Sequence, residues 1–264
     1  MQHIILSPPS WVFPTVAAST WLAMLLAMLG HWTMIGEPRY GLMKPGQNIP
    51  YALISPTFIT GVIPRIHLTA FDRFISDIGA QELKPLFMIG CITTVLLLNL
   101  SFYQFVQNKG YINKTCTHGS FLFTVLGSIG LIMLSVLDNI NHHFMHDVCV
   151  TIFIVGYLVS AALMCLDYIY LGIAHALREP MLMTSFCIKA SFIVVELGLI
   201  IVFRITEHTH YNQNNMAATL EWVIAFVFTG YILSLIVDLM PAAQRNLQNP
   251  KGYQRIEMST ALLP

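Results

Sequence analysis

The stretch that decides the fold reads VCVTIFIVGYLVSAALMCLDYIYL and covers residues 148 to 171. Asp167 is its only formally charged residue, and it contains no proline. A helix of about 20 apolar residues crosses a hydrocarbon core of about 30 Å and satisfies its own backbone hydrogen bonds there. Residues 148–171 therefore predict a membrane-spanning helix.

Other stretches of the chain have the same apolar character. The full set of six covers residues 11–35, 86–106, 119–137, 148–171, 182–203 and 217–240. The loops between the later stretches are short, so consecutive helices are expected to be antiparallel neighbours. The sequence predicts an all-α fold: a polytopic transmembrane bundle of about six helices, with residues 1–264 as a single membrane domain.

The composition points the same way and excludes several classes of function. Hydrophobic residues make up 56% of the chain and charged residues only 10%, with a mean hydropathy of +0.67. The formal net charge is zero, so no basic field favours a nucleic-acid partner. Phosphate-binding glycine loops, nucleophile elbows and Cys-x-x-Cys pairs are absent from the sequence. We therefore predict no cofactor and no soluble-enzyme chemistry.

The segment between the first two predicted helices, residues 36–85, is too long for a simple connector and is rich in proline. Its middle, residues 51–63, is apolar but broken by Pro56 and Gly61, which favours a surface or re-entrant element over a seventh span. The distribution of Lys and Arg predicts that both termini are cytosolic. Residues 36–85 then form a long first extracytoplasmic loop, and residues 241–264 form a cytosolic tail.

Ionisable residues inside the predicted spans are candidates for function, because charge is costly in a bilayer. Glu196 is the deepest of these acids and the sharpest candidate. The favoured interpretation nevertheless makes Glu196 a structural group, protonated or hydrogen-bonded in the interior. Lys189 is expected either to pair with a neighbouring helix or to extend its ammonium group to the membrane surface.

The densest polar cluster follows the third predicted helix. Its members are Asp138, Asn139, Asn141, His142, His143, His146 and Asp147. Histidines at helical spacing beside a carboxylate can bind a metal or act as an acid/base pair. Residues 207–210 bring a second histidine group to the same side. Solvated loop histidines are the favoured interpretation, and no metal site is predicted.

Three pieces of sequence carry a family resemblance. They are ISDIGA at residues 75–80 with Pro85 after it, the polar cluster ending in His146-Asp147, and Glu221-Trp222 at the start of the last helix. Their order and their placement against six helices resemble one superfamily. It joins the damage-regulated autophagy modulators (DRAM), the suppressor-of-four-kinase proteins of fungi, the TMEM150-type proteins, and the FGF-receptor-activating and GPI-remodelling proteins.

What the resemblance implies depends on the branch. DRAM-type relatives are lysosomal or vacuolar and promote autophagy, whereas the suppressor-of-four-kinase and TMEM150 types are plasma-membrane proteins that support phosphoinositide kinase complexes and lipid asymmetry. We expect a non-enzymatic integral membrane protein that modulates lipid organisation, phosphoinositide kinase recruitment or autophagy. The alternative is an intramembrane enzyme or lipid-handling factor in GPI-anchor lipid remodelling, located in the endoplasmic reticulum or Golgi.

Carried onto this chain, the family pattern concentrates on the extracytoplasmic face, at Asp77, His146, Asp147 and Glu221. We expect these residues to form a candidate functional cluster and assign none of them a catalytic role. A cavity opening toward the cluster would favour an enzyme or lipid carrier, because either must admit a headgroup. The expected partners are membrane lipids and a cytosolic protein that contacts the tail at residues 241–264.

The first piece of the pattern also carries a local prediction. Ser76 to Gly79 is expected to form a polar turn, with Gly79 in a backbone conformation that other residues avoid. Pro85 then leads into the second spanning helix, since proline is well tolerated in the first turn of a helix.

Overall fold

The computed structural model describes residues 9–34, 74–80, 82–108, 114–137, 142–175, 180–209 and 214–240. Within these ranges the chain forms seven helices and no strand: α1 (Val12–Met34), α2 (Ile75–Gly79), α3 (Lys84–Asn108), α4 (Lys114–Val136), α5 (His143–His175), α6 (Pro180–Thr209) and α7 (Asn214–Leu239). All but α2 are long and apolar enough to cross a membrane. The predicted all-α bundle of six spans is confirmed.

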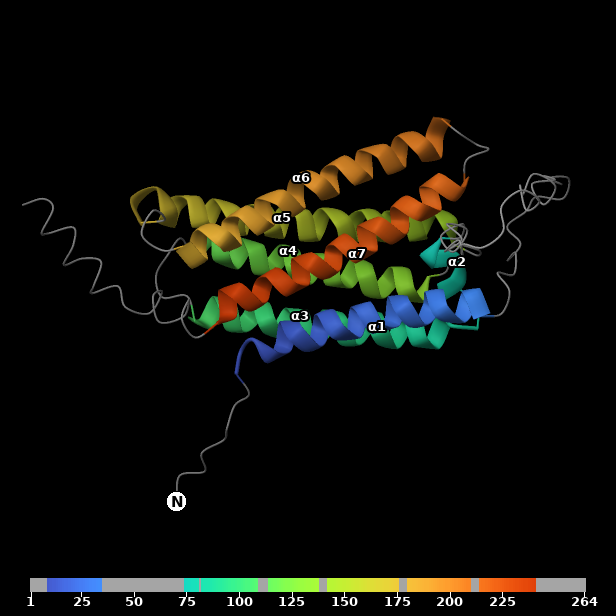
Figure 1. Cartoon of the computed structure of the whole chain (residues 1–264), viewed down its shortest axis with the longest axis horizontal. Coiled ribbons are helices and arrows are strands. Elements are labelled where there is room, and N and C mark those ends of the chain that lie inside the picture. The colour runs from blue at the N-terminus through green and yellow to red at the C-terminus, as the bar shows by residue number, and fades with distance from the viewer. Residues whose placement is uncertain are drawn as a thin grey trace, which may run out of the picture.

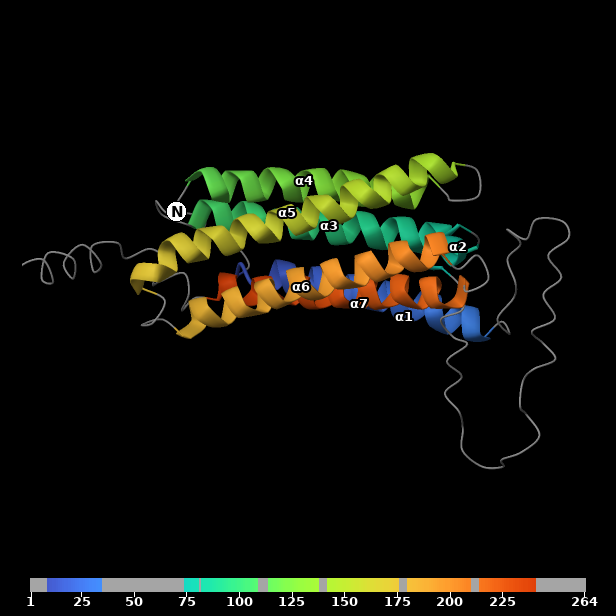
Figure 2. The same cartoon turned by 90° about the horizontal axis from the view of Figure 1, so that it is seen from above.

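The six long helices run along the longest axis of the molecule, and α2 lies at one end of the bundle (Figures 1 and 2). α1 begins and α7 finishes at the opposite end. This arrangement puts the first and last described residues on the same side of a membrane. That this side is the cytosol stays a prediction from the charge distribution.

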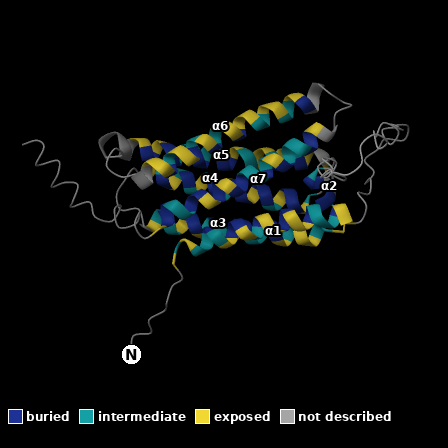
Figure 3. Ribbon diagram, viewed as in Figure 1, coloured by how far each residue is buried: buried dark blue, intermediate teal, exposed yellow. Residues whose placement is uncertain are grey.

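The spanning helices pack as a closed ring. α1 contacts α3, α3 contacts α4, α4 contacts α5, α5 contacts α6, α6 contacts α7, and α7 returns to α1. Buried residues lie on the inner faces of the helices, and exposed ones lie on the outer faces (Figure 3). Large aromatic side chains fill much of the interior, with Trp222, Tyr157 and Tyr231 at most 2% exposed. The ring therefore has an inside that can hold a site.

The interface between α4 and α5 is built from small and hydroxyl-bearing residues. A Cβ atom on Gly156 of α5 would lie 2.6 Å from the Cα atom of Gly127 of α4, so the two backbones are in direct contact there. Ser160 of α5 exchanges hydrogen bonds with Ser120 at 3.1 Å and Thr124 at 2.7 Å across the same interface. Membrane helices commonly associate through small residues and interhelical hydroxyl contacts of this kind.

α6 is the most peripheral of the spanning helices. Only 17% of its apolar window is buried inside the protein, against 39–50% for the other five spans. Its outer face is therefore exposed to the bilayer over most of its length.

Helix boundaries extend beyond the apolar stretches that predicted them. α5 begins at His143, several residues before residue 148, and α3 begins at Lys84 with Pro85 in its first turn. Helical hydrogen bonding continues into the polar surface layer, and proline in a first turn removes a donor that has no partner within the helix.

The predicted polar turn at Ser76 to Gly79 is wrong. Residues Ile75–Gly79 form the short helix α2, and the backbone of Gly79 is not in the left-handed region. The glycine instead permits close packing, because a Cβ atom there would lie 2.9 Å from the ring of Phe87. The glycine signal in the sequence was real, but its cause is a contact with α3 rather than a strained turn.

Two predicted regions lie wholly or mostly outside the described residues. They are the long loop at residues 36–85, of which 74–80 and 82–85 are described, and the tail at residues 241–264. The predictions for their location and for the tail's partner therefore remain predictions.

Candidate functional site

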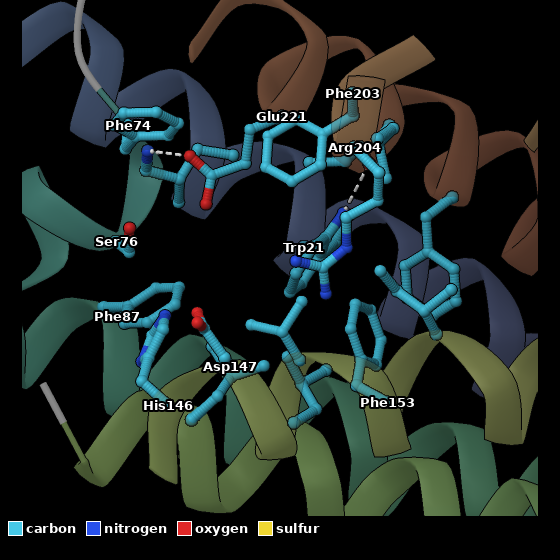
Figure 4. Close-up of a pocket in the computed structure, with 18 residues that line it drawn as sticks. Trp21, Phe74, Ser76, Phe87, His146, Asp147, Phe153, Phe203, Arg204 and Glu221 are labelled. Carbon is cyan, nitrogen blue, oxygen red and sulfur yellow. Dashed lines mark hydrogen bonds between the residues drawn. The ribbon is translucent and has the colours of Figure 1, made fainter. Parts of the chain in front are cut away.

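A cavity of about 200 Å³ lies inside the ring of helices, at the end of the bundle where α2 sits (Figure 4). Each of the six spanning helices and α2 contributes at least one residue to its wall. The cavity therefore exists only when the whole ring is assembled, and it is the natural candidate for a functional site.

One part of the cavity wall is aromatic. Trp21 of α1, Phe153 of α5 and Phe228 of α7 line it together with Phe87 of α3. The Trp21 indole N–H donates a 2.9 Å hydrogen bond to the backbone carbonyl of Ala225, which fixes the orientation of the ring. Phe228 meets Trp21 edge to face at 5.5 Å and Phe153 at 5.3 Å between ring centroids. These contacts make a rigid apolar wall.

The remaining wall is polar and carries charge. Asp147 of α5, Arg204 of α6 and Glu221 of α7 line the cavity, together with His146 and Ser76. His146 is only 5% exposed, and its Nδ1 atom lies 2.8 Å from the backbone carbonyl of Leu137. Because a carbonyl can only accept, Nδ1 carries the proton, and Nε2 of the neutral ring is then an acceptor.

Glu221 links two elements that are far apart in the sequence. Its Oε2 atom accepts a 2.7 Å hydrogen bond from the backbone N–H of Ile75, the first residue of α2. Phe74, at the N-cap position, provides no side-chain cap for that helix. A carboxylate is the favoured partner for the free N–H groups at a helix start, so Glu221 supplies the cap from α7.

The structure brings together most of the predicted cluster. His146, Asp147 and Glu221 line the same cavity. Asp77 lies in α2, directly after the cavity-lining Ser76, but its side chain is outside the described part of the structure. Glu196 does not line this cavity.

Arg204 is the residue that sequence reasoning missed. It directly follows the predicted span at residues 182–203. The available signal was its isolation, because it is the one Lys or Arg assigned to the short extracytoplasmic loops. A lone basic side chain at the end of a span is a candidate site residue as well as a signal for the membrane topology.

A second polar centre lies near the other end of the bundle, between α6 and α7. Lys189 Nζ forms an ion pair with Asp238 Oδ2 at 2.6 Å, and both side chains are essentially buried. Tyr168 and Ser185 also donate hydrogen bonds to Asp238. Lys189 thus pairs with a neighbouring helix, one of the two outcomes that the sequence left open.

Glu196 lies on α6 between these two polar centres. Its side chain is 4% exposed, and its Oε2 atom has no hydrogen-bond partner among the described residues. The hydrogen-bonded form of the structural interpretation therefore has no partner for Oε2 in the described part of the protein, whereas the protonated form needs none.

The histidine clusters do not assemble into a metal site in the described part of the chain, where no three His, Cys, Asp or Glu side chains come close enough to hold an ion. The side chains of His143 and of residues 207–210 lie outside it.

Comparison with known proteins agrees with this architecture. The sequence-family model described as Frag1/DRAM/Sfk1/Cwh43P N-terminal domain matches residues 73–242, which include α2 to α7 and most of the cavity wall. Protein SFK1 of Saccharomyces cerevisiae is 22% identical to the chain, over 88% of this chain and 79% of that protein. Protein sfk1 of Schizosaccharomyces pombe is 28% identical, over 88% of this chain and 64% of that protein.

No solved structure matches the chain. The family match covers more than half of the sequence, and the six apolar helices agree with it. The chain belongs to the Frag1/DRAM/Sfk1/Cwh43 family of integral, multi-pass membrane proteins.

Proposed function

We propose that this protein binds a membrane lipid in the cavity and modulates lipid organisation without catalysing a reaction. The observation that carries the proposal is the wall of the cavity, which joins a charged part, with Asp147, Arg204 and Glu221, to an aromatic part around Trp21 and Phe153. A lipid has the same division between a polar headgroup and apolar chains. A cavity that opens toward this cluster supports lipid handling over a plain scaffold, because a scaffold need not admit a headgroup.

The similarity to two SFK1 proteins favours the suppressor-of-four-kinase branch among those that the sequence suggested. We propose a location at the plasma membrane, where that resemblance implies support of phosphoinositide kinase complexes. A role in autophagy at the vacuole or lysosome is the second assignment. Fluorescent tagging in cells decides between them, since the two branches differ in compartment.

The lipid-binding proposal is tested by native mass spectrometry of the purified protein. Val150→Trp adds a large side chain at a residue that lines the cavity, whereas Val148→Trp adds the same group to the exposed face of the same helix. We expect the wild type and Val148→Trp to retain bound phospholipid and Val150→Trp to lose most of it. Equal lipid retention by all three proteins contradicts the proposal.

A second matched pair protects this test against misfolding of Val150→Trp. Ile224 of α7 lines the cavity, and its neighbour Val223 is exposed. Ile224→Trp is expected to lose lipid and Val223→Trp to keep it. Melting curves in detergent identify the variants that are folded, so that loss of lipid is read only from these.

The alternative function is an intramembrane enzyme or lipid-handling factor in GPI-anchor lipid remodelling. It is favoured by the same cavity, because His146, Asp147 and Glu221 all line it, and an imidazole beside carboxylates can carry out acid/base chemistry. Incubation with a GPI-anchored lipid substrate distinguishes the two. A change in the mass of the lipid part supports the enzyme, and unchanged lipid supports the binding protein.

We also propose that residues 241–264 contact a cytosolic protein partner. This tail holds three basic residues, Arg245, Lys251 and Arg255, fewer than a strong polybasic membrane-binding segment needs. Truncation after residue 240 is expected to abolish partner recruitment while the protein stays in the membrane. Recruitment that survives truncation contradicts the proposal.

A further inference from the structure

The charges of the cavity wall are mixed, and this restricts its ligand. Asp147 and Glu221 contribute two carboxylates, and Arg204 contributes one guanidinium group. These are the only formally charged residues among the described ones that line the cavity. A purely anionic ligand meets one favourable and two unfavourable charges in this partly enclosed space, where electrostatic interactions are stronger than in bulk water. The wall therefore disfavours a headgroup that carries negative charge alone.

We propose that the cavity binds the headgroup of a phospholipid that carries a cationic nitrogen as well as a phosphate, as ethanolamine and choline headgroups do. This inference rests on the lipid-binding function proposed above. Its chemistry excludes inositol and glycerol headgroups as preferred ligands of the cavity. Any effect on phosphoinositides is then exerted elsewhere on the protein or through a partner.

Arg204 is the phosphate ligand in this arrangement. Its planar guanidinium group presents donors in a fork that matches two phosphate oxygens, which a single ammonium group cannot do. In the view of Figure 4 the guanidinium group extends from α6 into the cavity, on the side of Trp21 and Phe153. The phosphate accordingly lies toward α6.

The two carboxylates receive the cationic nitrogen. Figure 4 shows the Asp147 and Glu221 carboxylates on the side of the cavity near Ser76 and Phe87, away from the Arg204 guanidinium group in this view. Glu221 accepts a hydrogen bond from Ile75, and a carboxylate group can accept several hydrogen bonds at once. Aromatic faces in the wall add attraction for a cation, including one that has no N–H donors.

The size of the cavity fits a headgroup and excludes a whole lipid. A volume of about 200 Å³ lies below the roughly 300–1,000 Å³ of pockets that bury a drug-sized ligand. The acyl chains must then lie outside the cavity, against the apolar surfaces of the helices. The exposed aliphatic residues of α6, such as Val194, Leu197 and Ile201, offer such a surface beside Arg204.

The experiment measures which headgroup the purified protein selects. Delipidated protein is incubated with an equal mixture of phosphatidylethanolamine, phosphatidylcholine, phosphatidylinositol and phosphatidylglycerol, and bound lipids are quantified by native mass spectrometry. We expect the two nitrogen-bearing lipids to be enriched about tenfold, the effect of one charge-assisted contact. Phosphatidylethanolamine and phosphatidylcholine, offered separately, show whether the cavity prefers the ammonium or the trimethylammonium group.

Conservative variants assign the selectivity to the named charges. Asp147→Asn should reduce the preference for nitrogen-bearing lipids several-fold while phospholipid binding persists, and Glu221→Gln should act in the same direction. Arg204→Gln should weaken the binding of all four lipids. The matched controls are Glu82→Gln and Lys84→Gln, which lie at the same end of the bundle but outside the cavity wall. They should change neither the headgroup preference nor the amount of bound lipid.

Each outcome separates this inference from the function on which it rests. Binding without selectivity, or a preference for phosphatidylinositol or phosphatidylglycerol, overturns the inference and leaves lipid binding intact. No bound lipid of any class overturns the proposed function and this inference together. If the preference for nitrogen-bearing lipids survives Asp147→Asn in folded protein, the Asp147 carboxylate does not recognise the headgroup. This result also overturns the inference. Asp147→Asn carries this test alone if Glu221→Gln does not fold.

Discussion

The backbone N–H of Ile75 donates a 2.7 Å hydrogen bond to the carboxylate of Glu221, although the two residues are 146 positions apart in the chain. The bond fastens α2 to α7 across one end of the helix ring and places Ser76 in the cavity wall. α2 thus depends on a side chain from another helix for its N-terminal cap. Its position over the cavity should be sensitive to that side chain.

Glu221→Ala is expected to release α2. A hydrogen bond to a charged acceptor contributes about 1.5–3 kcal/mol, so backbone amide exchange in residues 74–80 should accelerate roughly tenfold or more. Hydrogen–deuterium exchange with peptide mapping measures this rate. Val223→Ala, on the exposed face of the same helix, is the control and should leave exchange at residues 74–80 unchanged. Unaltered exchange in Glu221→Ala means that other contacts hold α2.

The ion pair between Lys189 and Asp238 should be strongly coupled. Removing one partner of a buried pair leaves an uncompensated charge and costs about 3–5 kcal/mol. Lys189→Met alone and Asp238→Leu alone should each destabilise the protein, while the double variant should be more stable than the sum of the two changes predicts. Denaturant titration of the detergent-solubilised protein gives the change in unfolding free energy for the two single variants and the double variant. Strict additivity contradicts the assigned pair.

Gly156 should tolerate no side chain. A Cβ atom at Gly156 would lie 2.6 Å from Gly127, so Gly156→Ala forces α4 and α5 apart and should cost about 1–3 kcal/mol, as overpacking does. Gly230→Ala is the matched control, because nothing lies within 4 Å of its Cβ position. The control should be neutral or slightly stabilising, since alanine favours helix over glycine. Melting temperatures of the two variants test this, and equal values contradict the close approach.

Glu196→Gln should yield folded protein. Its Oε2 atom forms no hydrogen bond within the described residues, so an amide loses no hydrogen bond of that atom and brings no charge into the interior. We expect an unchanged or higher melting temperature and a monodisperse profile in size-exclusion chromatography. Aggregated protein favours the structural interpretation of Glu196. Folded protein with altered lipid organisation in cells favours the functional one.

The six spans could be predicted from the sequence because a bilayer imposes a strict condition on the backbone. Each long apolar stretch had to be a helix, and each became one, from α1 around Trp21 to α7 around Phe228. The cluster of His146, Asp147 and Glu221 was predictable from the family resemblance together with the alternating helix directions, which bring the N-terminal ends of α5 and α7 to one side.

The rotation of each helix about its own axis was not predictable. A helix that is apolar on every side contains no periodic signal for its inner face, because lipid and protein interior favour the same residues. Sequence reasoning therefore did not place Arg204 in the cavity, join Ile75 to Glu221, or select Asp238 as the partner of Lys189. Those pairings depend on which face each helix turns toward its neighbours in the ring.

The most direct test of the central claim is photocrosslinking of a phospholipid that carries a diazirine on its headgroup, in membranes that contain the intact protein. We predict adducts on the cavity-lining parts of α5 and α7, residues 146–154 and 221–228, that disappear in Val150→Trp and persist in Val148→Trp. Adducts confined to outward-facing residues, or adducts that Val150→Trp leaves unchanged, contradict a headgroup site inside the ring.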